Sequence, residues 1–285
     1  MVDEYRTLWV RAVLIKLCKR KSMSEFKKFF AENPVFTAEE FKDAFLNGRS
    51  VHTLHAQLKH YTNSGYIAAI RRGVYFVKGV TEKAAVPDEY LVASKLAEDV
   101  VLGYHTAFDV LGFGHSLYYR IYCLTKKRRS PMKLQSLQII PLPQPVALLR
   151  RKQEMFGVEK VERLGKKILV TGKERTLVDC FDHPEYAGGF EELYRCAEKM
   201  PYLDYDTLLH YLKLRAGKAL FAKIGFYLEQ HRDELYVEER VLQALRKSVP
   251  KEPVYLQARR EGGVLQKRWN LIVPEMVINR KWEEF

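Results

Sequence analysis

Residues 37–77 decide the fold that we expect for the first part of this chain, and they read TAEEFKDAFLNGRSVHTLHAQLKHYTNSGYIAAIRRGVYFV. Thr37 precedes Glu40 by three residues, which is the spacing of a capping box at the start of a helix. The helix that begins there ends at Asn47-Gly48, because these residues favour turns. Upstream, phenylalanines at helical spacing predict another helix, which ends before Pro34.

Ser50 begins a third predicted helix, because its hydroxyl can accept a hydrogen bond from an amide of the first turn. One face of this helix is apolar and is formed by Val51, Leu54, Leu58 and Tyr61. The other face is polar, and its residue types suit the major groove of DNA: glutamine pairs with adenine, threonine contacts base edges, and basic side chains reach guanine or phosphate. The residues that we expect to contact DNA are Arg49, Ser50, His52, Thr53, Gln57, Lys59 and His60.

A β-hairpin is predicted directly after this helix. Residues 66–70 and 74–77 have strand-like composition, and they flank the turn Arg71-Arg72-Gly73. Two arginines, Arg71 and Arg72, at the tip of a β-ribbon can hold the DNA backbone or enter a minor groove. Helices followed by a basic hairpin predict a winged helix-turn-helix within residues 1–80, with an extra helix at its N-terminus.

The rest of the chain, residues 81–285, predicts a larger mixed α/β domain, so the fold class that we expect is α+β. Residues 81–171 alternate between helical and strand patterns, with strands at 118–125 and 137–140 and a hairpin over 158–170. From residue 172 onward the apolar residues recur at helical spacing, which predicts a mainly helical segment.

The net charge of +13 is concentrated in two segments. Residues 1–80 hold 14 lysines and arginines against 7 acidic residues, and residues 120–175 hold 15 against 4. Clustered positive charge favours binding to polyphosphates through the release of counterions. We therefore expect a second basic surface made of Lys126, Lys127, Arg128, Arg129, Lys133, Arg150, Arg151, Lys166, Lys167, Lys173 and Arg175.

The composition also argues against several classes of protein. No apolar run approaches the roughly 18 residues of a membrane-spanning helix, and the N-terminus lacks a signal-peptide pattern, so we expect a cytoplasmic protein without a membrane partner. The four cysteines are widely spaced and form no CxxC pair, which predicts buried thiols rather than disulfides or a zinc site. We expect neither a metal nor another cofactor.

Enzymatic motifs fit poorly. Gly172-Lys173 is followed by Glu174 where a P-loop needs serine or threonine, so no Walker motif is present. Asp179 and Asp182 lie three residues apart and leave open one alternative, a metal-dependent enzyme that acts on nucleic acid. His105 lies at a predicted helix start, where a hydrogen-bonded structural role is favoured over catalysis.

Three successive segments of the chain resemble the AbiEi family, the antitoxins of abortive-infection, type IV toxin–antitoxin systems. These segments are residues 52–77, residues 89–114 (EYLVASKLAEDVVLGYHTAFDVLGFG) and residues 170–193 (VTGKERTLVDCFDHPEYAGGFEEL). The resemblance implies an N-terminal domain that represses its own operon at inverted repeats in promoter DNA. It also implies a C-terminal domain that counteracts a nucleotidyltransferase-like toxin without a stable direct complex.

The sequence therefore predicts a DNA-binding autorepressor and antitoxin rather than an enzyme. Two alternatives stay open: the metal-dependent enzyme with Asp179, and a general regulator whose C-terminal domain senses a ligand. These alternatives differ in observable ways, since an enzyme gives a magnesium-dependent product and a ligand-sensing regulator changes its operator affinity when the ligand is added.

Overall fold

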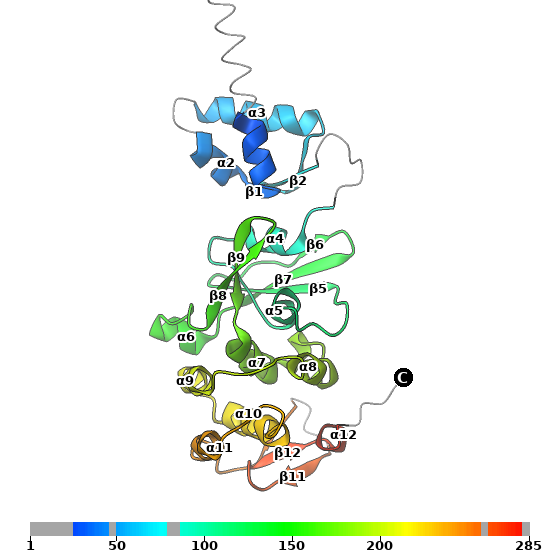
Figure 1. The fold of residues 1–285 in the computed structure, drawn as a ribbon. Helices are drawn as coiled ribbons and strands as arrows, with labels where there is room; N and C mark the ends of the chain where they lie inside the picture. The colour runs from blue at the N-terminus through cyan, green and yellow to red at the C-terminus, as the bar shows by residue number, and fades with distance from the viewer. Residues whose placement is uncertain (1–24, 46–49, 79–85, 258–261, 281–285) are drawn as a thin grey trace, which may run out of the picture. The chain divides into compact units, whose positions relative to one another are not determined.

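The computed structural model describes residues 25–45, 50–78, 86–257 and 262–280 of a chain that divides into two units (Figure 1). The first unit comprises residues 1–96 and 162–166, and the second comprises residues 97–161 and 167–285. Helices and strands occur together in both units, so the predicted α+β class is confirmed.

The first unit combines short helices with one small antiparallel sheet. Its described elements are a helix over residues 25–32, β1 (Val35–Thr37), α2 (Ala38–Phe45), α3 (Val51–Asn63), β2 (Ile67–Arg71), β3 (Val74–Val77) and α4 (Glu89–Ser94). The strand order is β1-β3-β2, and in this sheet Tyr75 of β3 pairs with Phe36 on one side and Ala69 on the other. The predicted hairpin and the three helices predicted directly before it are confirmed, whereas the extra N-terminal helix that we expected lies outside the described residues.

Local hydrogen bonds set the starts of these helices. Thr37 N donates to Glu40 Oε2 at 2.8 Å, and Glu40 N donates to Thr37 Oγ1 at 3.1 Å, so the predicted capping box is confirmed. Ser50 Oγ accepts a hydrogen bond from Thr53 N at 3.2 Å and caps α3, also as predicted. Gly73 has a φ of +80°, which glycine adopts in the hairpin turn without a steric penalty.

A core rich in aromatic rings holds α3 by one face. The rings of Phe30 and Phe41 stack with centroids 5.8 Å apart, and Tyr61 of α3 lies edge-on to Phe30 at 4.9 Å. Buried aromatic side chains of this kind dominate the energetics of a small core. The buried members of this core are Phe26, Phe30, Phe36, Phe41, Leu54, Leu58, Tyr61 and Ile67.

The segment around α4 belongs to the first unit, which thus continues past the boundary at residue 80 that we expected from the sequence. Asp88 caps α4 by accepting from Leu91 N at 2.9 Å, and it also accepts from Arg163 Nε at 2.7 Å. Lys95 forms an ion pair with Glu40 of α2. These side-chain contacts join α2, α4 and the segment 162–166.

A mixed six-stranded sheet begins the second unit. The elements of this part are β4 (Val101–Leu102), α5 (His105–Val110), β5 (Arg120–Thr125), β6 (Met132–Leu134), β7 (Leu137–Pro143), α6 (Val146–Arg151), β8 (Val158–Arg163) and β9 (Lys166–Thr171). The strand order is β6-β7-β5-β4-β9-β8, with β5 parallel to β7 and β4 parallel to β9. The strands and the hairpin predicted within residues 118–171 are confirmed.

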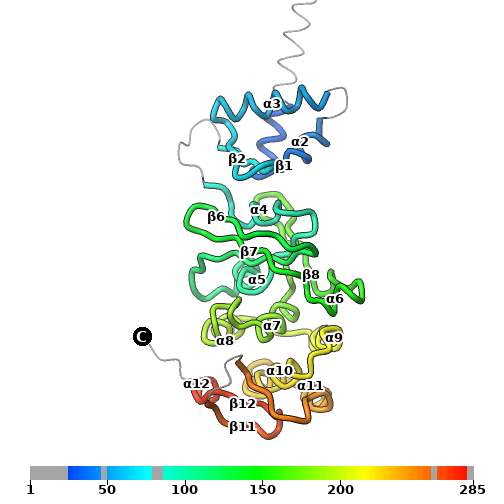
Figure 2. Tube along the Cα trace, turned by 180° about the vertical axis from the view of Figure 1, so that it is seen from behind, coloured from blue at the N-terminus to red at the C-terminus, as the bar shows by residue number. Residues whose placement is uncertain are grey.

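Helices predominate after the sheet, as the periodicity predicted. They are α7 (Lys173–Asp182), the short 3-10 helix η1 (Pro184–Tyr186), α8 (Phe190–Ala197), α9 (Tyr205–Arg215), α10 (Lys218–Gln230), α11 (Glu239–Arg246) and α12 (Glu275–Ile278). A small sheet completes the unit, with β10 (Val254–Tyr255), β11 (Val264–Gln266) and β12 (Leu271–Val273) in the order β10-β12-β11. Figures 1 and 2 show α7, α8 and α9 between the six-stranded sheet and the segment that contains α10 to α12.

A close approach between α10 and Trp269 fixes the small sheet to the helices. A Cβ atom at Gly225 would lie 2.1 Å from Trp269 Cζ3, so only glycine lets the indole ring pack against the backbone of α10. Trp269 Nε1 donates to Glu229 Oε2 at 2.6 Å, which satisfies the one polar atom of this buried ring.

The described residues bear on two predictions, namely that no helix spans a membrane and that the cysteines are buried thiols. Within these residues, no helix combines the length and the apolar character that crossing a membrane requires. Cys123, Cys180 and Cys196 are buried free thiols, as predicted, whereas Cys18 lies outside the described residues.

Candidate nucleic-acid interface

The outward face of α3 is polar and lacks carboxylates. At 3.6 residues per turn, positions 52, 56, 59 and 63 align along the side opposite the buried Leu54, Leu58 and Tyr61. His52, Ala56, Lys59 and Asn63 occupy these positions, and all four are exposed. No aspartate or glutamate occurs among the thirteen residues of α3, so nothing on this helix repels phosphate.

Most of the residues in and just before α3 that we predicted as DNA contacts are exposed. His52, Thr53, Lys59 and His60 are exposed on α3, as expected. Ser50 is exposed as well, but its hydroxyl already caps the helix. Arg49 lies outside the described residues.

Gln57 is less well placed than the sequence suggested. Its side chain is only half-exposed, because position 57 borders the buried face of Leu54, Leu58 and Tyr61. Ala56 and Asn63, which we did not select, lie nearer the centre of the outward face. A rotation of 100° per residue around the helix axis, applied to the sequence alone, places both positions there. Val51, which we assigned to the apolar face, is 41% exposed at the first turn of α3.

The hairpin between β2 and β3 places the two predicted arginines at its tip. Arg71 and Arg72 are both exposed, and Gly73 completes the turn. Arg71 Nη2 lies 3.5 Å from Leu96 O, at the long limit of a hydrogen bond, so this guanidinium has further donors available. Arg72 extends from the turn itself, which makes it the better placed of the two for a phosphate.

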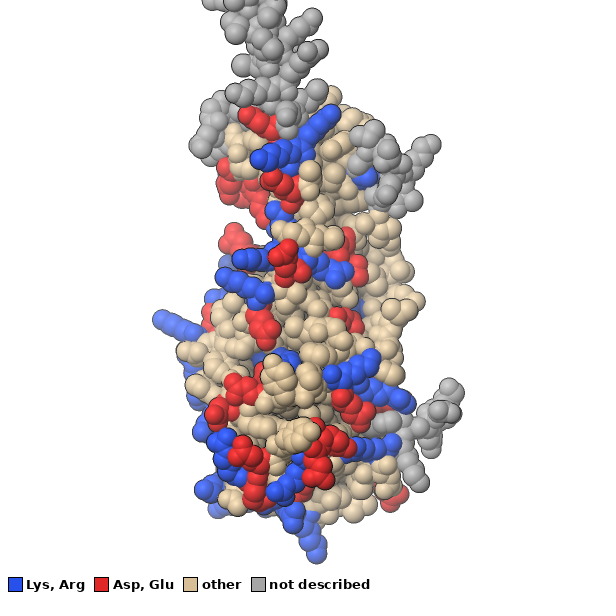
Figure 3. All heavy atoms as spheres, in the orientation of Figure 1, with Lys and Arg blue, Asp and Glu red and all other residues tan. Residues whose placement is uncertain are grey.

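Charge differs between α3 with its hairpin, which carries basic and no acidic side chains, and the neighbouring helix α2. The helix α2 carries Glu39, Glu40 and Asp43, and Lys42 of the same helix is paired with Glu39 at 2.7 Å. Figure 3 shows acidic side chains gathered over the α2 region of the first unit. A polyanion is thus attracted to α3 and the hairpin and repelled from α2.

The residues of the second basic surface that we predicted belong to several different elements. Its members lie in the β5–β6 connection, in β6, at the end of α6, at the start of β9 and in α7. Lys126 forms an ion pair with Glu154, and Lys173 Nζ donates to Tyr202 O at 2.9 Å and lies over the ring of Tyr202. The exposed members are Lys126, Lys127, Arg128, Arg129, Lys133, Arg150, Arg151 and Lys167.

Our prediction for Arg175 is wrong, because it is a core residue rather than part of a phosphate-binding surface. It is 1% exposed, and its Nη1 donates to the carbonyls of Glu154 and Phe156, each at 2.8 Å. Its Nη2 donates to Gln144 Oε1 at 2.8 Å. These bonds hold the segment between α6 and β8 against α7, and they leave the guanidinium no access to a ligand.

The carboxylates of the enzymatic alternative also belong to this internal network. Asp179 is 1% exposed; it accepts from Tyr211 OH at 2.7 Å and pairs with Arg215 and with Arg175. Asp182 pairs with the other terminal nitrogen of Arg215. A carboxylate already bound by two guanidinium groups is a poor ligand for magnesium, so this pair does not fit a two-acid metal site.

A second buried polar cluster joins α5 to α8 through His105. His105 Nδ1 lies 3.1 Å from Asp109 Oδ2, and His105 Nε2 lies 2.9 Å from Glu192 Oε1. Burial opposes ionisation of His105, but its bonds and attraction to Asp109 and Glu192 outweigh burial and raise its pKa. Burial also acts against the charge of Glu192, yet hydrogen bonds from His105, Ser116 and Cys196 lower the pKa of Glu192 to about 2.

Metal binding at this cluster is disfavoured by the same hydrogen bonds. The ligand atoms of His105, Glu192 and Cys196 lie within 4.8 Å of one another. However, a metal needs a deprotonated imidazole nitrogen and a thiolate, whereas the contacts of His105 raise its pKa and burial raises the pKa of Cys196. The cluster therefore fits the structural role that we predicted for His105.

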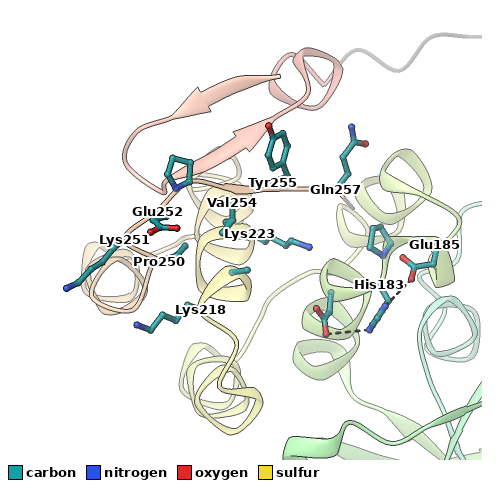
Figure 4. Close-up of a pocket in the computed structure, with 14 residues that line it drawn as sticks. His183, Glu185, Lys218, Lys223, Pro250, Lys251, Glu252, Val254, Tyr255 and Gln257 are labelled. Atoms are coloured by element: carbon teal, nitrogen blue, oxygen red, sulfur yellow. Dashed lines mark hydrogen bonds and ion pairs between the residues drawn. The ribbon is translucent and has the colours of Figure 1, made fainter. Parts of the chain in front are cut away.

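A cavity of about 950 Å³ lies between the end of α7 and the first turns of α10. In Figure 4, Lys223 points from α10 toward the segment of His183 and Glu185, whereas Lys218 and Lys251 point away from that segment. Lys223 Nζ donates to Phe181 O at 3.0 Å, and His183 lies 3.0 Å from Glu185 Oε1. Lys223 and His183 already bond to the protein, and Lys218 and Lys251 point away from the segment of His183. We therefore assign no anion site to this cavity.

Comparison with known proteins shows a solved structure of similar fold and gives no information on function. No protein-family model and no curated protein matches this chain. Among solved structures, the chain is similar to the RV2827C protein from Mycobacterium tuberculosis, with 20% sequence identity and a TM-score of 0.58 over 90% of this chain and 92% of that chain. The likeness shows a shared fold across most of both chains, and the AbiEi resemblance stays a prediction from the sequence.

Proposed function

We propose that the first unit is a winged helix-turn-helix that binds double-stranded DNA, with α3 in the major groove and the β2–β3 hairpin as its wing. The observation that carries the proposal is the outward face of α3, which is exposed, polar and free of carboxylates while the opposite face is fixed in the core. The two exposed arginines at the tip of the adjacent hairpin support it.

The residue types on α3 allow both positioning and readout. Lys59 provides a charge for phosphate or for the acceptors of guanine, and Thr53 and Asn63 can exchange hydrogen bonds with base edges. Ala56 at the centre of the face lets the helix approach the groove closely, and its methyl group can contact a thymine methyl. Arg72 would hold the backbone without regard to sequence.

The AbiEi resemblance extends the proposal to the physiological role. We propose that the protein represses its own operon at inverted repeats and acts as an antitoxin against a nucleotidyltransferase-like toxin. It would act by binding rather than by catalysis, since Asp179 and Asp182 are engaged by arginines. A nucleotidyltransferase-like neighbouring reading frame whose toxicity is relieved by co-expression of this chain would support the antitoxin role, and toxicity unchanged by co-expression would contradict it.

DNA binding is tested by a salt titration with the full chain. The probes are a duplex from the region upstream of the chain's own reading frame and a scrambled duplex of equal length, both followed by fluorescence anisotropy. We expect tighter binding to the upstream duplex, with an affinity for both duplexes that falls as salt rises because counterions are released. Equal affinity for both duplexes at every salt concentration would contradict sequence-specific repression.

A further inference from the structure

A second cavity, of about 450 Å³, lies in the second unit between the end of α8 and the C-terminal half of α10. Its apolar lining comes from Met200, Pro201 and Leu235. Its polar lining includes Glu198, His231 and Arg280. A small cavity with an apolar wall and a few converging polar groups is the usual form of a small-molecule site.

His231 presents an unused acceptor at this cavity. The side chain is 2% exposed, and its Nδ1 lies 2.9 Å from Tyr227 O, so Nδ1 carries the proton and donates to this carbonyl. Burial lowers the pKa of His231, which favours the neutral ring, and in the neutral ring with a protonated Nδ1 the Nε2 atom is an acceptor. Among the described residues, no donor bonds to Nε2.

An acceptor of a second side chain lies close to His231 Nε2. Glu198 Oε1 lies 3.6 Å from His231 Nε2, and the Glu198 side chain is 41% exposed. Two lone pairs that face each other at this distance repel unless a donor lies between them or beside both. The hydroxyl of Tyr227, which also lines the cavity, is a further buried polar atom without a hydrogen-bond partner in the described part of the chain.

The charge at the cavity favours a cation. Arg280 Nη1 pairs with Glu234 Oε1 at 3.2 Å, and its Nη2 donates to Gln230 O, so Arg280 balances Glu234. Glu198 has no comparable ion pair with a lysine or arginine in the described residues, and its carboxylate faces Nε2 of His231. A ligand that brings positive charge and several donors satisfies Glu198 and His231 together.

We propose that this cavity binds a small organic cation with a primary ammonium group, whose N–H donors bond to His231 Nε2 and the Glu198 carboxylate while its carbon chain lies against Met200 and Leu235. An ammonium group supplies three donors from one atom, which matches two acceptors from different helical segments. The proposal concerns the second unit alone and is independent of DNA binding by α3.

The test uses n-butylammonium as the cationic probe and 1-butanol as its neutral counterpart of similar size, with the full chain. Binding is followed by NMR of protein labelled with ¹⁵N in histidine, where the Nε2 signal of His231, assigned by its loss in His231→Gln, reports a new donor at that atom. We expect n-butylammonium to give a saturable shift of this signal and to bind at least roughly tenfold more tightly than 1-butanol.

Glu198→Gln keeps the size of the side chain and removes its charge at a partly exposed position, so the fold should be retained. We expect it to weaken n-butylammonium binding by roughly tenfold. Glu252→Gln, at an exposed position that lines the other cavity, is the matched control and should leave binding unchanged.

Three outcomes would overturn the proposal. The first is equal binding of n-butylammonium and 1-butanol, which would show an apolar site without charge recognition. The second is binding that Glu198→Gln does not weaken. The third is a His231 signal that responds to zinc ions but not to millimolar n-butylammonium, which would assign the two acceptors to a metal ion instead.

Discussion

The helices α3 and α7 have similar proportions of polar side chains, yet these side chains are placed in opposite ways. In α3 the polar residues face solvent, and only three apolar side chains fix the helix to its core. In α7 eight consecutive residues from Glu174 to Phe181 are buried, including Arg175 and Asp179. The polar groups of α3 are available to a partner, whereas those of α7 are already bonded within the protein.

This difference shows why a local excess of positive charge does not locate a binding surface. Both segments lie in basic stretches of the chain, but charge counts say nothing about which guanidinium groups have internal partners. A buried charge is tolerated only when it is paired and hydrogen-bonded, and three of the hydrogen-bond acceptors of Arg175 belong to residues 19 to 31 positions away. Exposure without a partner, rather than charge alone, is what distinguishes α3.

The largest effect that separates the two helices is expected in α7. Asp179→Ala removes the carboxylate partner of the buried Arg175 and leaves the partly buried Arg215 with Asp182 alone, and breaking a buried ion pair typically costs about 3–5 kcal/mol. We expect a loss of this size in the free energy of unfolding of the second unit, measured by urea denaturation. Arg128→Ala, at an exposed position of the same basic stretch, should change it by less than about 0.5 kcal/mol. An equal effect of both substitutions would remove the contrast.

A smaller effect, dependent on pH, is expected at the His105–Glu192 pair. The folded-state pKa of Glu192 is about 2, so its contribution to stability is present above the unfolded value of 4.5 and is lost as the pH falls from 4.5 toward 2. The pKa of His105 is raised, so its contribution is present below 6.5 and is lost as the pH rises through the raised value.

The second unit should therefore have its highest stability from this pair between pH 4.5 and 6.5. Glu192→Gln should flatten both limbs of the profile of unfolding free energy against pH, whereas Glu191→Gln, one residue away and partly exposed, should preserve them. A profile for Glu192→Gln that matches the unsubstituted protein would contradict the assignment of these shifts.

On α3, the effect of a single lysine should appear in DNA binding and hardly at all in stability. Lys59→Ala removes one exposed charge, so the slope of log affinity against log salt should fall by about 1 for every duplex. Lys167→Ala, at an exposed position of β9, is the control. A larger change in slope for Lys167→Ala than for Lys59→Ala would move the phosphate-binding surface to the second unit.

The smallest effect is expected at Gln57, and it sharpens the account of the outward face. Because Gln57 borders the buried side of α3, Gln57→Ala should alter the preference for the upstream duplex less than Asn63→Ala does. A good base contact contributes about 1–3 kcal/mol to discrimination, so the two substitutions are distinguishable by competition binding. A larger loss of preference for Gln57→Ala would restore it as the main reader.

The sequence predicted the first unit more completely than the second, and the reason is local. The capping box of Thr37 and Glu40, the cap at Ser50 and the turn at Gly73 are formed by residues within three positions of one another. The pairing of Arg175 with Gln144, 31 positions away, and of His105 with Glu192, 87 positions away, depends on the tertiary fold. Periodicity identified the helices there but not their partners.

The candidate interface on α3 was also predictable in its local features but not in the orientation of the helix on its core. Helical spacing placed His52, Thr53, Lys59 and His60 on the exposed side of α3, but residue chemistry led us to favour Gln57 over the better placed Ala56 and Asn63. The orientation of a helix on its core is set by Leu54, Leu58 and Tyr61 together, and Val51 in the first turn misled the estimate of that orientation.

The most direct test of the central claim is the affinity of Ala56→Glu for the upstream duplex, measured by fluorescence anisotropy. Ala56 is exposed at the centre of the outward face, so the substitution adds a carboxylate there without disturbing the core. Ala31→Glu, at an exposed position of the helix over residues 25–32, is the matched control. If α3 lies in the groove, Ala56→Glu weakens binding at least about tenfold, since like charges across an interface cost several kcal/mol, and Ala31→Glu does not. Equal affinities for the two variants and the unsubstituted protein would contradict DNA binding by α3.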